Sequence, residues 1–136
     1  MTFVGVGAMG DSAPLLQDGF VNRDEMRALI KAGAVGEVVG WAFDRNGQFI
    51  EGMTNDRVAS VALDQPAKRL VIGAAMGAAK FEALRGALVG RIINGLITNE
   101  AAAAHLLKRL GRRSSEFSSP NQNGKYGCCA AATNLH

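Results

Sequence analysis

Hydrophobic residues are spaced most regularly in the second half of the chain, where apolar runs alternate with amphipathic segments. Leu70–Ala75 and Ile92–Thr98 are apolar runs of strand length, which is typical of strands buried in a parallel sheet. Ala78–Val89 places its large hydrophobic residues on one helical face, and Glu100–Leu110 is an alanine-rich helical segment. This order predicts two parallel strands joined by a right-handed crossover, and an α/β fold with flanking helices.

The first half of the chain contains shorter elements. The pattern predicts a helix at Arg23–Lys31, which Asn22 would cap and Gly33 would end. The residues Asp44–Gly47 are typical of a turn. The strands expected here are Phe3–Val6, Val38–Phe43, Gln48–Glu51 and Arg57–Leu63.

Composition narrows the class of protein. The 136 residues are enough for one domain. Hydrophobic residues make up 48% of the chain and charged residues 20%, and this composition excludes intrinsic disorder. No apolar run is long enough to span a membrane, and the start lacks the basic residues of a signal peptide, so we expect no membrane partner.

Charge is unevenly distributed. The formal charge of +3 and the pI of about 9.2 suggest that the protein binds nucleic acid. However, five of the 15 basic residues lie from Lys108 onward beside one acid, Glu116, so the first 107 residues hold ten basic and eleven acidic residues. The positive charge therefore belongs to the C-terminal stretch, where a helix end and a solvated tail explain it.

The last segment differs in composition from the rest. Residues 111–136 are rich in Ser, Asn, Gly and Ala without periodicity, so we expect a domain over 1–110 and a loosely ordered tail over 111–136. The two cysteines, Cys128 and Cys129, are adjacent, and neighbouring cysteines seldom form a disulfide or a zinc site by themselves. We therefore expect a reducing, cytoplasmic location and no metal or cofactor.

Two loops of the predicted parallel sheet carry candidate ligand-binding residues. Lys80 lies in the first turn of its helix, where lysine is unfavourable unless an anion is bound; a solvated surface lysine is the alternative. Thr98 and Asn99 either cap the next helix or contact a ligand. Because parallel strands end at one edge of a sheet, we expect Lys80 and Asn99 to face one crevice.

Other motifs are less specific. Gly5–Gly10 matches the G-x-G-x-x-G pattern of dinucleotide-binding folds, but Pro14 lies where the helix should run, so a flexible glycine loop is the simpler interpretation. The Asp44 carboxylate either binds turn amides or accepts hydrogen bonds from sugar hydroxyls. No catalytic triad is evident, and an acid–base pair would require the fold to bring Asp44 and Glu100 together.

Four stretches together resemble a known family. They are Gly33–Glu37, Gly40–Gly47, Val71–Leu88 and Leu96–Leu107. In this order and spacing they resemble the sugar-binding effector domain of SorC/DeoR-like bacterial transcriptional regulators, over about residues 3–107. The resemblance implies a parallel, Rossmann-like sheet of the NagB/RpiA/CoA-transferase-like fold. It also implies an oligomer that binds a phosphorylated sugar through Asp44, Gly77 and Lys80.

The chain departs from the family pattern at two positions. Met76 stands where a glycine is usual, and Asn99 replaces the aspartate of a Leu-Ile-Thr-Asp-Glu motif. Both changes would alter ligand choice or weaken binding. The match begins partway into an effector domain, so we expect a partial domain without the helix-turn-helix. Such a fragment would not contact DNA directly, and it would self-associate through uncovered sheet.

Two functions of different classes remain open at this point. The first is the effector-binding part of a sugar-responsive transcriptional regulator. The second is a sugar-phosphate isomerase or deaminase on the same fold, for which Asp44 is the candidate general base.

Overall fold

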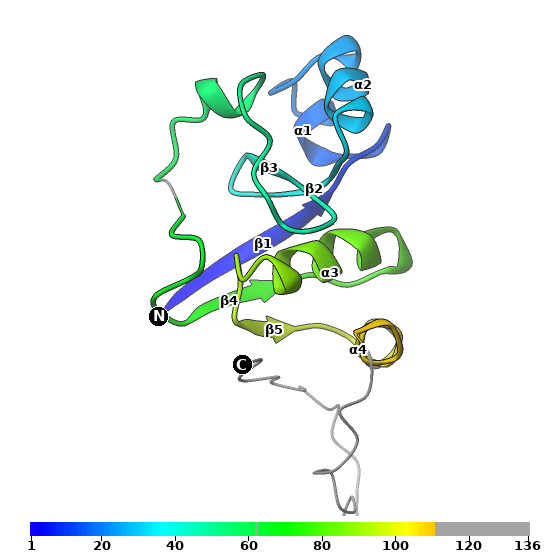
Figure 1. The fold of residues 1–136 in the computed structure, drawn as a ribbon. Coiled ribbons are helices and arrows are strands. Elements are labelled where there is room, and N and C mark those ends of the chain that lie inside the picture. Colours follow the sequence, from blue (N-terminus) through cyan, green and yellow to red (C-terminus); the bar gives the residue numbers. More distant parts are fainter. Residues whose placement is uncertain (62, 111–136) are drawn as a thin grey trace, which may run out of the picture.

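The computed structural model describes residues 1–61 and 63–110, which form one mixed sheet flanked by helices (Figure 1). The strand order is β3-β2-β1-β4-β5. The strands are β1 (Thr2–Ala8), β2 (Ala34–Val38), β3 (Trp41–Asp44), β4 (Val71–Ala74) and β5 (Gly95–Ile97). The predicted α/β sheet is confirmed, with parallel pairing of β1, β4 and β5, and β2 and β3 extend this parallel core by antiparallel pairing.

The helices agree well with the sequence pattern. They are α1 (Pro14–Gln17), α2 (Arg23–Lys31), α3 (Phe81–Val89) and α4 (Glu100–Arg109), with short 3-10 helices η1 (Asn55–Arg57) and η2 (Ala78–Lys80). The predicted ends of α2 are confirmed: Asn22 and Glu25 form a reciprocal capping box, and Gly33 follows the last turn with φ of 97°. The predicted helix from Ala78 begins as η2 and becomes α-helical at Phe81.

The predicted strand Val38–Phe43 is interrupted by the β2–β3 turn, since Val38 ends β2 and Trp41–Phe43 belong to β3. Val39 and Gly40 connect the two strands, both with positive φ, 46° and 92°. Left-handed conformations at both turn residues match the right-handed twist of a hairpin. The predicted strand Gln48–Glu51 is reduced to a single bridge between Phe43 and Phe49.

The predicted strand Arg57–Leu63 is also wrong at its described positions, since this segment begins in η1 and continues as coil. The buried side chain of Asn55 occupies the edge of β3 in its place. It accepts a hydrogen bond from the Ala42 N–H (2.8 Å) and donates to the carbonyls of Ala42 and Ile50. A primary amide can pair with a peptide group as a neighbouring strand would, so β3 needs no further strand there.

The larger core cluster lies on the face of the sheet that α3 and α4 cover, and a smaller cluster packs Leu29 of α2 against Ala34 and Ala42 of β2 and β3. Val4 and Val6 of β1 pack with Leu84 of α3 and Leu106 of α4. On the opposite face Phe3 is 58% exposed, and Ile97 is 43% exposed. The expectation of strands covered on both faces is therefore wrong at Phe3 of β1 and at Ile97 of β5.

None of the helices in residues 1–61 and 63–110 is both long enough and apolar enough to cross a membrane. The expected tail, residues 111–136, lies outside the described residues.

Candidate functional site

The loops that follow β4 and β5 lie side by side, as the parallel arrangement predicts. The Ala75 N–H donates to the Ile97 carbonyl (3.2 Å), and the Thr98 hydroxyl donates to the Ala75 carbonyl (2.6 Å). Asn99 caps α4, because its Oδ1 accepts a hydrogen bond from the Ala102 N–H (3.1 Å). Thr98 and Asn99 thus hold the two loops in place, which agrees with the capping interpretation.

Gly77 and Lys80 form the turn that leads from β4 into α3. Gly77 has φ of 103°, and a Cβ atom at this position would meet nothing within 4 Å. The glycine is therefore required by backbone conformation, and it leaves the space above the turn open. The Lys80 N–H donates to the Gly77 carbonyl (3.1 Å), which closes η2.

Lys80 lines an open cleft of about 320 Å³. The residues around this cleft, which we call the Lys80 cleft, are Gly5, Val6, Gly7, Pro14, Glu37, Val39, Ala74 and Lys80. Side chains alternate along a strand, so Gly5 and Gly7 face away from the core that contains Val4 and Val6. The cleft therefore lies on the sheet face opposite α3, and its floor consists largely of small residues.

Of the residues that line this cleft, the predicted ligand-binding set contains Lys80 alone. Gly5 and Gly7 belong to β1 rather than to a glycine loop, and they lie on the cleft floor. Their alternation with the buried Val4 and Val6 is a signal that the sequence does contain. Glu37 carries no comparable signal, because the antiparallel pairing of β2 with β1 brings it opposite Gly7.

Asp44 is not among the residues that line the Lys80 cleft. Its Oδ1 accepts hydrogen bonds from the backbone N–H groups of Asn46 (2.8 Å) and Gln48 (2.9 Å). This geometry agrees with the turn-binding interpretation. The turn lies against α3, because a Cβ atom at Gly86 would come within 2.8 Å of the Asp44 carbonyl oxygen.

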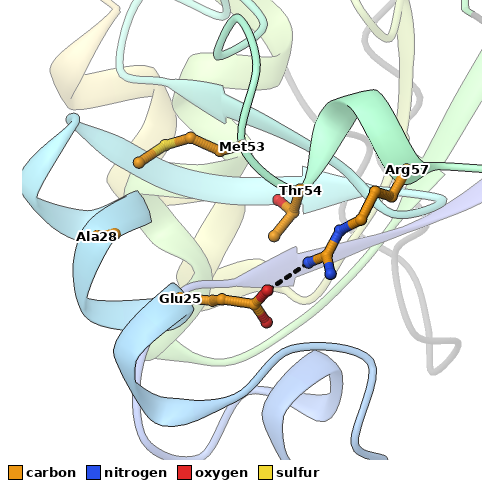
Figure 2. Close-up of a pocket in the computed structure, with 5 residues that line it drawn as sticks. All are labelled: Glu25, Ala28, Met53, Thr54 and Arg57. Atoms are coloured by element: carbon orange, nitrogen blue, oxygen red, sulfur yellow. Dashed lines mark hydrogen bonds and ion pairs between the residues drawn. The ribbon is translucent and has the colours of Figure 1, made fainter.

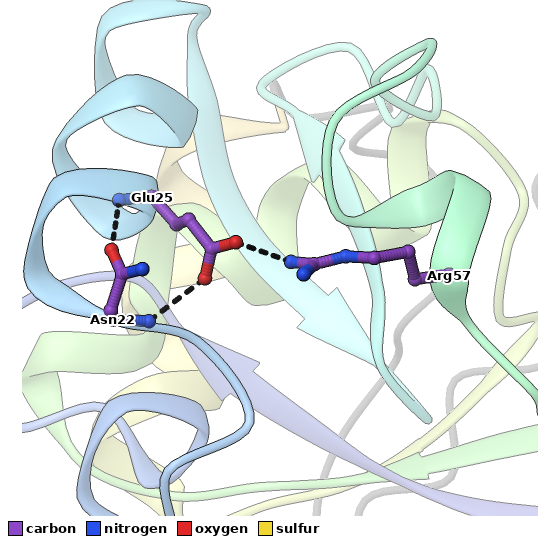
Figure 3. Close-up of polar contacts among 3 residues, drawn as sticks. All are labelled: Asn22, Glu25 and Arg57. Carbon is purple, nitrogen blue, oxygen red and sulfur yellow. Dashed lines mark hydrogen bonds and ion pairs between the residues drawn. The ribbon is translucent and has the colours of Figure 1, made fainter.

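Figure 2 shows a second hollow, of about 250 Å³, between α2 and the segment around η1. It is lined by Glu25, Ala28, Met53, Thr54 and Arg57. Its two charged side chains form an ion pair, in which Arg57 Nη2 lies 2.5 Å from Glu25 Oε1. Glu25 Oε2 also accepts a hydrogen bond from the Asn22 N–H at 2.9 Å (Figure 3). This hollow is the weaker ligand-binding candidate, because its ion pair joins α2 to η1.

This arrangement makes a pH dependence of stability testable. The hydrogen bond from the Asn22 backbone N–H, followed by the Arg57 guanidinium, lowers the pKa of Glu25 from its ordinary value of 4.5. A carboxylate with a lowered folded-state pKa contributes stability above its ordinary pKa, and this is lost as the pH falls through the lowered value. We expect Glu25→Gln to lower the urea midpoint at pH 7, and this difference to shrink at pH 3.

Asp24→Asn is the matched control. Asp24 pairs with Arg27 at 3.5 Å, but both side chains are largely exposed, so the pair contributes little to stability. A difference between wild type and Glu25→Gln that stays the same from pH 7 to pH 3 would contradict the assignment.

The site contains no constellation typical of metal-dependent catalysis. In residues 1–61 and 63–110, no three His, Cys, Asp or Glu side chains are grouped so that they could hold a metal ion. The dinucleotide pattern also lacks its usual context, because α1 is a single short turn that begins at Pro14.

Comparison with known proteins identifies the chain over the same span. The sugar-binding domain family Sugar-bind matches residues 1–108. The deoxyribonucleoside regulator of Bacillus subtilis (strain 168) is 36% identical over 106 residues, which cover 77% of this chain and 34% of the regulator. The transcriptional regulator LsrR of Klebsiella pneumoniae is 34% identical over 108 residues, which cover 76% of this chain and 33% of LsrR.

Solved structures agree with these relatives. The full-length sorbitol operon regulator SorC from Klebsiella pneumoniae matches with a TM-score of 0.67 and 29% identity, over 77% of this chain and 35% of SorC. The chain spans about a third of the length of the curated relatives that it matches. The sequence match and the shared fold together show that the chain belongs to the family of sugar-binding domains of SorC-, LsrR- and DeoR-type transcriptional regulators.

Proposed function

We propose that the chain binds a phosphorylated sugar and is the effector-binding part of a sugar-responsive transcriptional regulator. The observation that carries this proposal is the Lys80 cleft, an open hollow that is lined by Lys80 together with Gly5 and Gly7. Among the described residues, no carboxylate forms an ion pair with Lys80. A phosphate group is a suitable partner for this cation, and the glycines allow a ligand to approach the backbone closely.

The other proposed ligand-binding residues, Asp44, Gly77, Thr98 and Asn99, are not among the residues that line the Lys80 cleft, and they are proposed from their loops and from the family resemblance. Gly77 keeps the approach to Lys80 open, and Thr98 and Asn99 border the loop between β4 and η2. Asp44 is proposed on the family resemblance, although both of its printed hydrogen bonds are to turn amides. Thr98 and Asn99 retain unused hydrogen-bonding capacity for a sugar hydroxyl.

The regulatory role also favours a cytoplasmic location and DNA contact by other parts of a regulator. We place the regulator in the cytoplasm, and we assign DNA contact to parts of a regulator other than residues 1–110. The engagement of Asp44 by turn amides, and its absence from the lining of the Lys80 cleft, favour binding over isomerase or deaminase chemistry.

A ligand panel tests the proposed function. Pentose, hexose and polyol monophosphates are added separately, with the unphosphorylated compounds as controls, and thermal unfolding is followed. A ligand at 100 times its dissociation constant stabilises the folded state by about 2.7 kcal/mol, so we expect a rise of several degrees for at least one monophosphate. No stabilisation of this chain or of a full-length regulator containing it would refute the proposal. Catalytic turnover of the stabilising ligand would favour the enzyme alternative.

We further propose that the chain self-associates through its open sheet face. Phe3 and Ile97 are large apolar side chains exposed on this face. Within the described residues, β5 is also an edge strand with an unpaired side. We expect light scattering to give a mass above one chain. The replacement Phe3→Ser is expected to lower that mass, whereas Phe20→Ser, at a 73% exposed residue outside the sheet, is expected to leave it unchanged.

A further inference from the structure

The hollow between α2 and η1 contains a hydroxyl group that the fold itself does not use. Thr54 is only 9% exposed, yet within residues 1–61 and 63–110 its side chain neither caps η1 nor forms another hydrogen bond. Its side chain points into the hollow, toward α2 (Figure 2). A hydroxyl on a side chain this buried normally has a partner. The Thr54 hydroxyl is therefore free to bind a molecule that enters the hollow.

Arg57 supplies further hydrogen-bond donors to the same hollow. A guanidinium group carries five N–H donors, and the ion pair with Glu25 is made by Nη2. Among the described residues, no other contact of the Arg57 side chain is found, which leaves Nε and Nη1 for a ligand. These two atoms form a planar edge, which is the geometry that binds a carboxylate through two parallel hydrogen bonds.

The remaining wall of the hollow is apolar and is already in place. It consists of Ala28 and Met53, and Met53 has a left-handed backbone with φ of 55°. The buried amide of Asn55 anchors this segment through its hydrogen bonds to backbone groups. Because these contacts use neither the Thr54 hydroxyl nor the spare N–H groups of Arg57, the donors stay accessible without any rearrangement.

We propose that this hollow binds a small organic carboxylate, whose oxygens accept hydrogen bonds from Arg57 and Thr54. Its hydrocarbon part lies against Ala28 and Met53. The volume of about 250 Å³ equals that of about eight water molecules, which limits the ligand to about three to five carbon atoms. A phosphate is the poorer ligand, because the Glu25 carboxylate repels its second negative charge. The site shares no residue with the Lys80 cleft, so the inference does not rest on the proposed function.

A titration of the intact chain with sodium butyrate tests the inference. The NMR signals of the Thr54 amide and of the Arg57 Nε–H group are followed at constant ionic strength, and 1-butanol and inorganic phosphate are titrated separately. We expect butyrate to shift both signals with a dissociation constant of about 1–10 mM, which is within the limit for a ligand of this size. We expect 1-butanol and phosphate to bind at least about tenfold more weakly.

Two substitutions remove the proposed donors separately. Thr54→Val keeps the shape of the side chain and removes the hydroxyl, and Arg57→Lys keeps the charge that pairs with Glu25 but removes the planar edge. We expect each to weaken butyrate binding about tenfold. Thr54→Val is expected to leave the urea midpoint close to that of wild type, because no protein hydrogen bond is lost. The matched controls are Thr2→Val and Arg27→Lys, at exposed residues, which are expected to change neither quantity.

Four results would overturn the inference. The first is an absence of butyrate-induced shifts at 100 times the lower expected dissociation constant. The second is equal binding of butyrate and phosphate, which would mean that Arg57 attracts any counterion. The third is unchanged butyrate affinity in Thr54→Val, which decides the matter even if Arg57→Lys does not fold. The fourth is a fall in the urea midpoint of Thr54→Val with no change in affinity, which would make the hydroxyl structural.

Discussion

Replacing Gly47 by alanine is expected to destabilise the fold more than the other substitutions considered above. Gly47 has φ of 75°, and a Cβ atom there would overlap the Gly86 carbonyl oxygen and come within 2.5 Å of the Gly90 Cα. A left-handed conformation costs an alanine roughly 1–2 kcal/mol, and overpacking against backbone adds about 1–3 kcal/mol. We therefore expect the free energy of unfolding to fall by about 3 kcal/mol or more.

Gly19→Ala is the matched control for Gly47→Ala. Gly19 has a similar φ of 77°, but a Cβ atom there would meet nothing within 4 Å. This variant carries the conformational cost alone, so we expect a loss of about 1 kcal/mol. Urea unfolding of both variants measures the difference. If both variants lost the same free energy of unfolding, the close contact between the Asp44–Gly47 turn and α3 would add nothing to the cost of Gly47→Ala, which would contradict the prediction.

The close approach at Gly47 matters for the position of Asp44. The turn backbone reaches Gly86 of α3 and Gly90, which caps the C-terminal end of that helix, and neither residue has a side chain to keep the turn away. Asp44 is thereby held beside the middle and end of α3, whereas Lys80 precedes the first turn of that helix. The two residues that the family resemblance pairs are therefore arranged along one helix.

Lys80→Met is expected to have the largest effect on ligand binding. Methionine keeps an unbranched side chain but removes the ammonium group from the Lys80 cleft. A hydrogen bond to a charged group contributes roughly 1.5–3 kcal/mol, so we expect the affinity for the stabilising monophosphate to fall by about 10- to 100-fold. Because no ion pair of Lys80 is lost among the described residues, the unfolding midpoint without ligand is expected to stay close to that of wild type.

Lys68→Met is the matched control for Lys80→Met. Lys68 is 77% exposed and pairs with Asp64 at 3.8 Å, so its removal is expected to change neither binding nor stability measurably. Lys80→Arg retains the positive charge and is expected to bind better than Lys80→Met. Unchanged affinity in Lys80→Met would remove the lysine from the site and would direct attention to the Thr98–Asn99 loop.

The local elements were largely predictable, whereas the pairing of strands was not. The helix Arg23–Lys31 was correct at both ends, because its capping box and its glycine act within a few residues of the helix itself. The β2–β3 turn was misplaced, because the sequence offers a stronger turn motif at Asp44–Gly47 than at Val39–Gly40. The positive φ of Val39 is tolerated where strand pairing and the Glu37–Gly40 hydrogen bond hold the turn.

The sequence by itself determined the α/β class, the parallel unit formed by β4, α3 and β5, and the placement of Gly77, Lys80, Thr98 and Asn99 in adjacent loops. These features follow from local hydrophobic periodicity and from the rule that parallel strands end at one edge. Only the tertiary structure decided that Gly5, Gly7 and Glu37 meet Lys80 in one cleft. The reason is physical: the pairing of β1 with both β2 and β4 joins segments far apart in the chain, and no local pattern encodes which residues then face each other.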